Sequence, residues 1–296
     1  MKPTTRGAMT LSDGPTRPTE PPLFRESPAD WRPEQLFDVH VNLGVTDADG
    51  IGYGRLQPAE YQSFMDRSGI TRACVFPPLM ADYHTANLEL RDWALDNEPR
   101  ALVFARLGGA DGPRPVRRFW QARQALGARL KGVAASVPDL EGFAGVKMIP
   151  HLSGLPDTET MTAINAAELP VLIHAGAHST PSWIEKTVLP RLRGPVILAH
   201  LGAYPTEAGL LTDAVDLARR NARVYLDTSG VWVSEFLRYA AQRVPGKMLF
   251  GSDAPLAHPD VAWLQLASAI RCDKTLETIG WTNAAALFNL PGQFDR

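Results

Sequence analysis

Four titratable side chains stand at the carboxyl-terminal ends of short apolar runs in the sequence. His40, His174 and His200 close three of these runs, and Asp253 follows a fourth, at residues 248–251. A single histidine at the end of a strand is more often structural than functional. Three histidines and an aspartate in equivalent places at four strand ends instead indicate a shared site. Two imidazoles and one carboxylate are sufficient for a catalytic zinc, which takes about three nitrogen or oxygen ligands and keeps one position open.

The donor types predict a division of roles among these residues. We expect His40, His174 and Asp253 to bind a divalent metal, with zinc as the first choice and iron(II) or manganese(II) as alternatives. A metal there would lower the pKa of water toward neutrality and supply a hydroxide nucleophile. Asp253 would then accept a proton, and His200 would polarise the substrate oxygen. The catalytic roles therefore fall to Asp253 and His200.

A scaffold is needed that brings these strand ends together. Apolar runs alternate with helix-like segments after residue 35, and the runs themselves lack the polar alternation of half-exposed strands. Continuous apolar character is typical of parallel strands that are buried on both faces. Helical patterns lie at residues 58–68 and 206–221. The expected strands cover residues 36–41, 70–76, 101–107, 144–149, 171–174, 196–200, 224–228 and 248–251.

Eight strand-and-helix units over about 255 residues match the size and pattern of a (β/α)8 barrel. We predict a TIM barrel as a single domain over residues 35–296, with all eight carboxyl-terminal strand ends on one face. A doubly wound open sheet is the alternative fold, and it requires a glycine-rich phosphate turn after the first strand. Glycines 44, 50, 52 and 54 do not have that spacing.

The first 34 residues differ from the rest of the chain. Prolines stand at positions 3, 15, 18, 21, 22, 28 and 33, and the segment has almost no apolar periodicity. Such a segment buries too little surface to offset the entropy of ordering it. We predict a disordered tail over residues 1–34. It lacks the apolar core of a signal peptide, so we expect a cytoplasmic protein.

Composition excludes several classes of protein. The 296 residues include 30 basic and 32 acidic side chains, so the basic excess of a nucleic-acid binder is absent. No apolar run approaches the roughly 20 residues of a membrane helix. The two cysteines, Cys74 and Cys272, show no CxxC spacing, which excludes a disulfide scaffold and a cysteine zinc site. We expect a small-molecule substrate as the partner, and the sequence leaves homo-oligomerisation open.

The order of the motifs resembles the amidohydrolase superfamily, in its amidohydrolase-related branch. The matching segments are 38–42 (DVHVN), 145–147 (GVK), 170–176 (PVLIHAG), 198–202 (LAHLG) and 250–255 (FGSDAP), within residues 36–290. The resemblance implies a distorted (β/α)8 barrel that is a metal-dependent hydrolase of amides, esters or lactones. It equally allows a non-oxidative decarboxylase. It also implies His40, His174 and Asp253 as metal ligands, with His200 assisting.

Asn42 departs from the family motif, which is usually His-x-His where this chain has His40-x-Asn42. An amide is a weaker zinc ligand than an imidazole, and two outcomes follow. Either the site is mononuclear and Asn42 supplies an oxygen or orients water, or the metal is lost, as in the metal-independent lactonases of this branch. A catalytically inactive scaffold barrel is a third interpretation. The presence of His174, His200 and Asp253 argues against it.

Other polar residues near strand ends are candidate substrate contacts. Some family members carry a carboxylated lysine on strand 4 that bridges two metals, but without a second strand-1 histidine we expect Lys147 to be a charge partner or a substrate hook. Asp38 is expected to be structural, while Asp227 and Ser229 are expected to line the pocket. The predicted substrate contacts are Lys147, Arg106, His151, Tyr204 and Trp232.

Overall fold

The computed structural model describes residues 33–45, 55–80, 82–108 and 138–290. Most of the predicted tail, residues 1–32, lies outside this part of the chain. Eight of its strands form one sheet in chain order, and every neighbouring pair is parallel. They are β1 (Leu36–Asn42), β4 (Ile70–Phe76), β5 (Ala101–Leu107), β6 (Gly145–Met148), β7 (Val171–Ile173), β8 (Val196–Leu198), β9 (Val224–Asp227) and β10 (Met248–Leu249).

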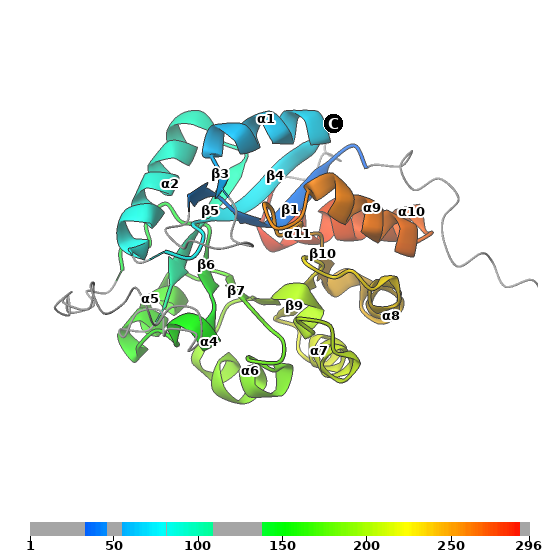
Figure 1. Ribbon diagram of the computed structural model, residues 1–296. Helices are drawn as coiled ribbons and strands as arrows, with labels where there is room; N and C mark the ends of the chain where they lie inside the picture. Colours follow the sequence, from blue (N-terminus) through cyan, green and yellow to red (C-terminus); the bar gives the residue numbers. More distant parts are fainter. Residues whose placement is uncertain (1–32, 46–54, 81, 109–137, 291–296) are drawn as a thin grey trace, which may run out of the picture.

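Main-chain hydrogen bonds close the sheet into a barrel (Figure 1). The Val39 amide donates to the carbonyl of Phe250 at 2.9 Å, and the Asn42 amide donates to Ala254 at 2.7 Å. These bonds join β1 to the segment after β10. A short hairpin of β2 (Gly44–Val45) and β3 (Arg55–Leu56) follows β1. The predicted (β/α)8 TIM barrel is confirmed, and one strand of the barrel lies at each predicted apolar run, with β1 extending one residue beyond its run.

Helices surround the strands on the outside of the barrel (Figure 1). The predicted helix at 58–68 is confirmed as α1, and its first residue is a proline, whose fixed φ suits a first helical turn. The helix predicted at 206–221 begins at Ala208 because Glu207 is still extended. The longer described helices are α1 (Pro58–Ser68), α2 (Tyr83–Asn97), α5 (Thr158–Ala166), α6 (Pro181–Thr187), α7 (Ala208–Arg220), α8 (Ser234–Arg243) and α9 (Pro259–Ala269).

Shorter helical segments complete the described chain. They are α4 (Pro150–Ser153), η2 (Leu189–Arg191), η3 (Ala199–Gly202), η4 (Pro245–Lys247), α10 (Asp273–Glu277), η5 (Thr278–Thr282) and α11 (Asn283–Leu287). No helix among the described residues has the length and apolar character required to cross a bilayer.

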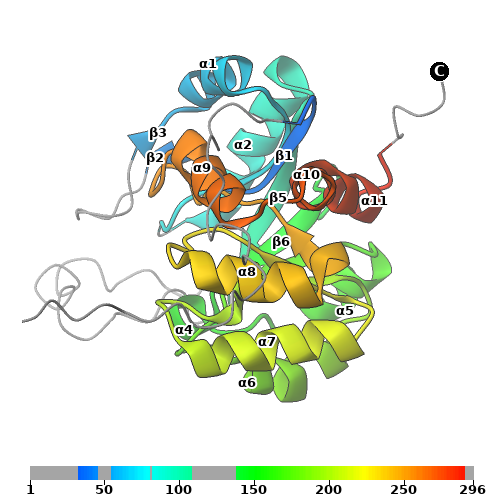
Figure 2. The ribbon, with the colours of Figure 1, turned by 90° about the vertical axis from the view of Figure 1, so that its right-hand side faces the viewer.

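Apolar side chains fill the amino-terminal end of the barrel. The Phe37 ring lies 5.3 Å from Phe288, and the Phe104 ring lies 5.9 Å from it. Phe288 directly follows α11, which therefore covers this end. Figure 2 shows α11 and the β2–β3 hairpin on opposite sides of the molecule. Polar side chains are consequently left to the carboxyl-terminal end, where active sites of this fold lie.

Strand alternation directs specific polar side chains into the barrel. On β6, Val146 and Met148 belong to the layer between the strands and the helices, whereas Lys147 between them faces inward and is fully buried. On β1 the pairing register with β4 shifts between Asp38 and Val41, around His40. Irregularities of this kind re-aim side chains and are common beside active sites.

Candidate active site

His40 lies on β1 with both ring nitrogens engaged. Its Nδ1 is 2.8 Å from Asp227 Oδ2 and 2.9 Å from Ser229 Oγ. Its Nε2 faces Lys147 Nζ at 3.2 Å and Asp253 Oδ1 at 3.4 Å. A carboxylate at Nδ1 favours the proton on that nitrogen, which leaves the Nε2 lone pair directed at the barrel centre. Asp227 thus prepares His40 to act as a ligand or a proton acceptor.

His200 follows β8 in a left-handed backbone conformation, with φ of 60°. Its main-chain amide donates to Asp227 Oδ1 at 3.0 Å, and its Nδ1 donates to the Ser229 carbonyl at 2.8 Å. A carbonyl oxygen can only accept, so Nδ1 carries the proton and the neutral ring presents a lone pair at Nε2. Such a conformation is costly for a non-glycine residue and is often found at functional sites.

Asp253 follows β10 and is also left-handed, with φ of 64°. Its amide donates to the His40 carbonyl at 2.9 Å. The side-chain nitrogen of Asn42 donates to Asp253 Oδ1 at 3.2 Å and to the Ala254 carbonyl at 3.3 Å. With this amide orientation Asn42 orients the carboxylate of Asp253 through its nitrogen.

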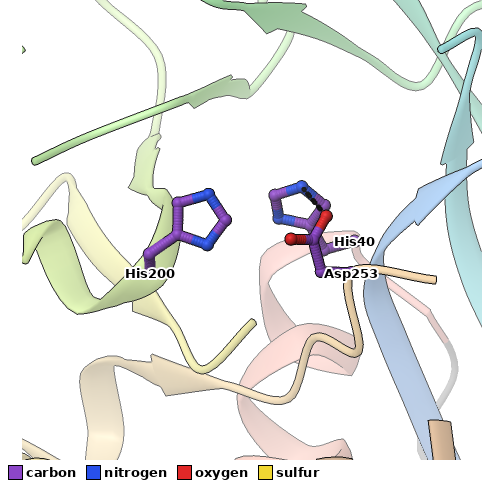
Figure 3. Close-up of side chains that lie close together, drawn as sticks. All are labelled: His40, His200 and Asp253. Carbon is purple, nitrogen blue, oxygen red and sulfur yellow. Dashed lines mark ion pairs between the residues drawn. The ribbon is translucent and has the colours of Figure 1, made fainter. Parts of the chain in front are cut away.

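His40, His200 and Asp253 form the one cluster of potential metal ligands found in the described part of the chain. Their donor atoms all lie within 4.8 Å of one another. Figure 3 shows the three side chains pointing toward one another from different strand ends. His174 lies beside this cluster, with its Nδ1 3.1 Å from His200 Nε2. The distances therefore group His200 with His40 and Asp253, and the sequence-based role of His174 as a ligand stays a prediction.

The donor set fits a divalent metal. Two imidazoles and one carboxylate meet the usual requirement, and both imidazoles present a lone pair that is fixed by a hydrogen bond at the opposite ring nitrogen. Burial lowers the pKa of His200 and His174, which keeps these rings neutral and able to coordinate. Burial opposes ionisation of Asp227, yet His40, His200 and Lys147 hold the pKa of its carboxyl well below the usual range.

Lys147 places a basic amine beside the same cluster. Its side chain is fully buried, with Nζ 3.2 Å from His40 Nε2 and 5.0 Å from the centre of the Phe76 ring. Burial lowers the pKa of Lys147 to about 7, against the attraction of Asp227 and Asp253. The predicted placement of Lys147 in the barrel mouth is supported by these contacts.

The family model described as "Amidohydrolase" matches residues 18–290 of the chain. The chain belongs to the amidohydrolase family. No curated protein matches it.

Solved structures similar to this amidohydrolase share its fold at low sequence identity. A 5-carboxyvanillate decarboxylase from Sphingomonas paucimobilis has 16% identity and a TM-score of 0.55, covering 88% of this chain and 100% of that chain. A dihydroxybenzoic acid decarboxylase from Polaromonas sp. JS666, with bound manganese and 2-nitroresorcinol, has 16% identity and a TM-score of 0.53, covering 86% and 97%. A probable 2-pyrone-4,6-dicarboxylic acid hydrolase from Acinetobacter baumannii, with citric acid bound, has 16% identity and a TM-score of 0.55, covering 86% and 99%.

The other predicted substrate contacts of the amidohydrolase lie at different distances from the cluster. The Tyr204 ring is 5.1 Å from both His174 and His200 and is 43% exposed, so it lies over the site at the surface. The His151 ring is 4.8 Å from His174, and burial lowers the pKa of His151 to about 4. Both positions suit residues that meet a substrate as it enters.

The positions of Arg106 and Trp232 give weaker support for a role in substrate binding. Arg106 is buried, donates to the Pro77 carbonyl at 2.6 Å and has its guanidinium carbon 6.0 Å from the Phe76 ring, the same ring that Lys147 approaches. Trp232 is 53% exposed, and among the described residues no hydrogen bond joins it to the cluster. Their roles as substrate contacts stay predictions.

The roles of the residues that anchor the cluster were the hardest to predict from the sequence. Asp38 accepts from the Ser252 amide at 2.9 Å and from the Ser252 hydroxyl at 2.6 Å, which ties β1 to the segment that carries Asp253. Asp227 was expected to line the pocket, but it contacts His40 and His200 from below. The only sequence signal for this role is its position at the end of an apolar run between the motifs that contain His200 and Asp253.

Proposed function

We propose that this amidohydrolase hydrolyses a small organic compound at an amide, ester or lactone carbonyl. The observation that carries the proposal is the cluster of His40, His200 and Asp253 at the carboxyl-terminal end of a closed barrel. Membership of the amidohydrolase family supports metal-dependent carbonyl chemistry at such a cluster. His40, His200 and Asp253 would hold the metal, which would supply an activated water; zinc, iron(II) and manganese(II) are the candidates.

The surrounding residues carry the proton transfers and the polarisation. Asp253 accepts the proton of the attacking water, and Asn42 keeps its carboxylate in place. His200 presents a lone pair and no proton at Nε2, which suits a ligand and does not suit a donor to the substrate oxygen. Lys147 is the nearest positive group, so we assign polarisation of the substrate oxygen to Lys147 instead.

A non-oxidative decarboxylase is the second candidate, favoured by the buried amine of Lys147 beside the cluster. A protonated lysine in a buried site can pair with a substrate carboxylate. In that reaction the carbon–carboxylate bond breaks, carbon dioxide leaves, and Asp253 in its protonated form returns a proton to the carbon. Two of the similar solved structures are named as decarboxylases, although at 16% identity they establish the fold alone.

One panel of substrates tests both candidates. The protein, supplied with manganese(II) or zinc, would be incubated with small lactones, esters, amides and hydroxylated aromatic acids. Release of acid marks hydrolysis, and release of carbon dioxide marks decarboxylation. We expect turnover of one class by the wild type and by Asp213→Asn, a change on the exposed face of α7, and loss of turnover in Asp253→Asn. Turnover that survives Asp253→Asn would overturn the proposal.

A further inference from the structure

Lys147 and a metal require the same nitrogen of His40. The Nδ1 side of that ring is already held by Asp227 at 2.8 Å, so Nε2 is the nitrogen left to coordinate. Lys147 Nζ lies 3.2 Å from Nε2. An imidazole nitrogen has one in-plane lone pair, and it cannot both accept a hydrogen bond from an ammonium and bind a metal.

Lys147 is also attracted by the same carboxylates that would attract a metal. Asp253 and Asp227 both attract its ammonium, and these are the carboxylates that face a metal in the cluster directly or through His40. Burial disfavours the charge, but the face of the Phe76 ring, 5.0 Å from Nζ, adds to the attraction of the carboxylates for a cation. The chain thus carries its own positive group within reach of the donor atoms.

We propose that Lys147 is a tethered cation that competes with divalent metal for the cluster of His40, His200 and Asp253. The competition has two parts. The ammonium must leave His40 Nε2 before a metal can bind there, and while it remains nearby it repels the metal through the low-dielectric interior. The inference rests on the proposed function in so far as it takes this cluster to be the metal site.

Competition predicts a metal site of low affinity that strengthens when the lysine charge is removed. Lys147→Met keeps the length and apolar stem of the side chain without its charge. Lys147→Gln is a second uncharged replacement that tolerates a polar surrounding. Lys247→Met is the matched control, because Lys247 precedes β10 at the opposite end of the barrel, where it lies 4.4 Å from the Tyr225 ring.

The experiment is calorimetric titration of chelator-treated protein with manganese(II) and, separately, with zinc, alongside circular dichroism of each variant. We expect Lys147→Met or Lys147→Gln to bind at least about tenfold more tightly than the wild type, because a like charge a few ångströms away is removed. Lys247→Met should match the wild type. Tight metal binding by a folded Lys147 variant, with wild-type binding too weak to measure by calorimetry, would be the strongest form of this result.

Other outcomes separate this inference from the proposed function. Equal or weaker binding by the folded lysine variants, with clear binding by the wild type, overturns the competition but leaves the metal site standing. Absence of binding in the wild type and in both variants overturns both. If neither variant folds, a wild type that binds either metal with submicromolar affinity contradicts a competing cation, and millimolar affinity supports it.

Discussion

Asp227 holds two active-site histidines at once: its Oδ2 lies 2.8 Å from His40 Nδ1, and its Oδ1 accepts the main-chain amide of His200 at 3.0 Å. One fully buried carboxylate therefore fixes the ring of the first histidine and the strained backbone of the second. β9 lies next to β8 and is separated from β1 only by β10, so a side chain at its end can reach both histidines.

Asp227→Asn should disorganise the site while the barrel remains folded. An amide can present its NH2 group to His40 Nδ1, which would move the ring proton to Nε2 and remove the ligand lone pair. We expect metal affinity to fall by about 10- to 100-fold, as for other residues that orient metal ligands. Titration with manganese(II) measures this change, with Asp213→Asn as the control. Unchanged affinity would show that Asp227 does not orient His40.

Gly230→Ala should damage both stability and activity. Gly230 has φ of 61°, and an added Cβ would lie 3.2 Å from His200 Nδ1 and 3.6 Å from Asp253 Oδ2. The left-handed conformation alone costs a residue with a side chain about 1–2 kcal/mol. Chemical denaturation should show this loss in the free energy of unfolding. Gly209→Ala, at the second residue of α7 with no atom within 4 Å of the added Cβ, should instead raise the free energy of unfolding by up to about 0.5 kcal/mol.

The two cysteines should react very differently with an alkylating reagent. Cys74 is buried and burial raises its pKa, whereas Cys272 is exposed and hydrogen bonds from Thr275 lower its pKa. Because only the thiolate reacts, Cys272 should be alkylated at lower pH than a free cysteine. Mass spectrometry of the native protein treated with iodoacetamide over a pH series should locate a single label on Cys272. Labelling of Cys74 without unfolding would contradict its burial.

Asn42→His should strengthen metal binding. Asn42 contacts Asp253 at 3.2 Å, so an imidazole at this position adds a nitrogen donor beside the cluster. We expect about tenfold tighter binding of zinc, because imidazole is the better zinc ligand. Asn289→His, at the other end of the barrel beside Phe288, is a control for adding a histidine. A weaker site in Asn42→His would mean that its bond to Asp253 matters more than an extra ligand.

Much of the fold was predictable from the sequence because buried parallel strands have continuous apolar runs. Each of the eight runs became a strand, and the chain order of the motifs placed His40, His200 and Asp253 on one end of a barrel. The first and last residues of the helices were harder to predict. Glu207, for example, has helix-compatible neighbours but remains extended before α7.

The roles within the site were harder to predict because they depend on atoms rather than residue types. The sequence shows that His174 and His200 both end strands, but the Ser229 carbonyl determines which nitrogen of His200 carries the proton. In the same way, the contact of Lys147 with His40 joins residues 107 positions apart and depends on the inward turn of one side chain on β6. Neither the protonated nitrogen of His200 nor the contact of Lys147 with His40 can be predicted from patterns along the chain.

Metal stoichiometry is the most direct test of the central claim, that His40, His200 and Asp253 form a metal-dependent catalytic centre. Wild-type protein and His40→Ala would be dialysed to equilibrium against a millimolar excess of manganese(II) or zinc and assayed by elemental analysis, with circular dichroism to confirm folding. The account predicts about one ion per wild-type chain and none above background in His40→Ala. Equal metal content in the two proteins, or none in the wild type, would contradict it.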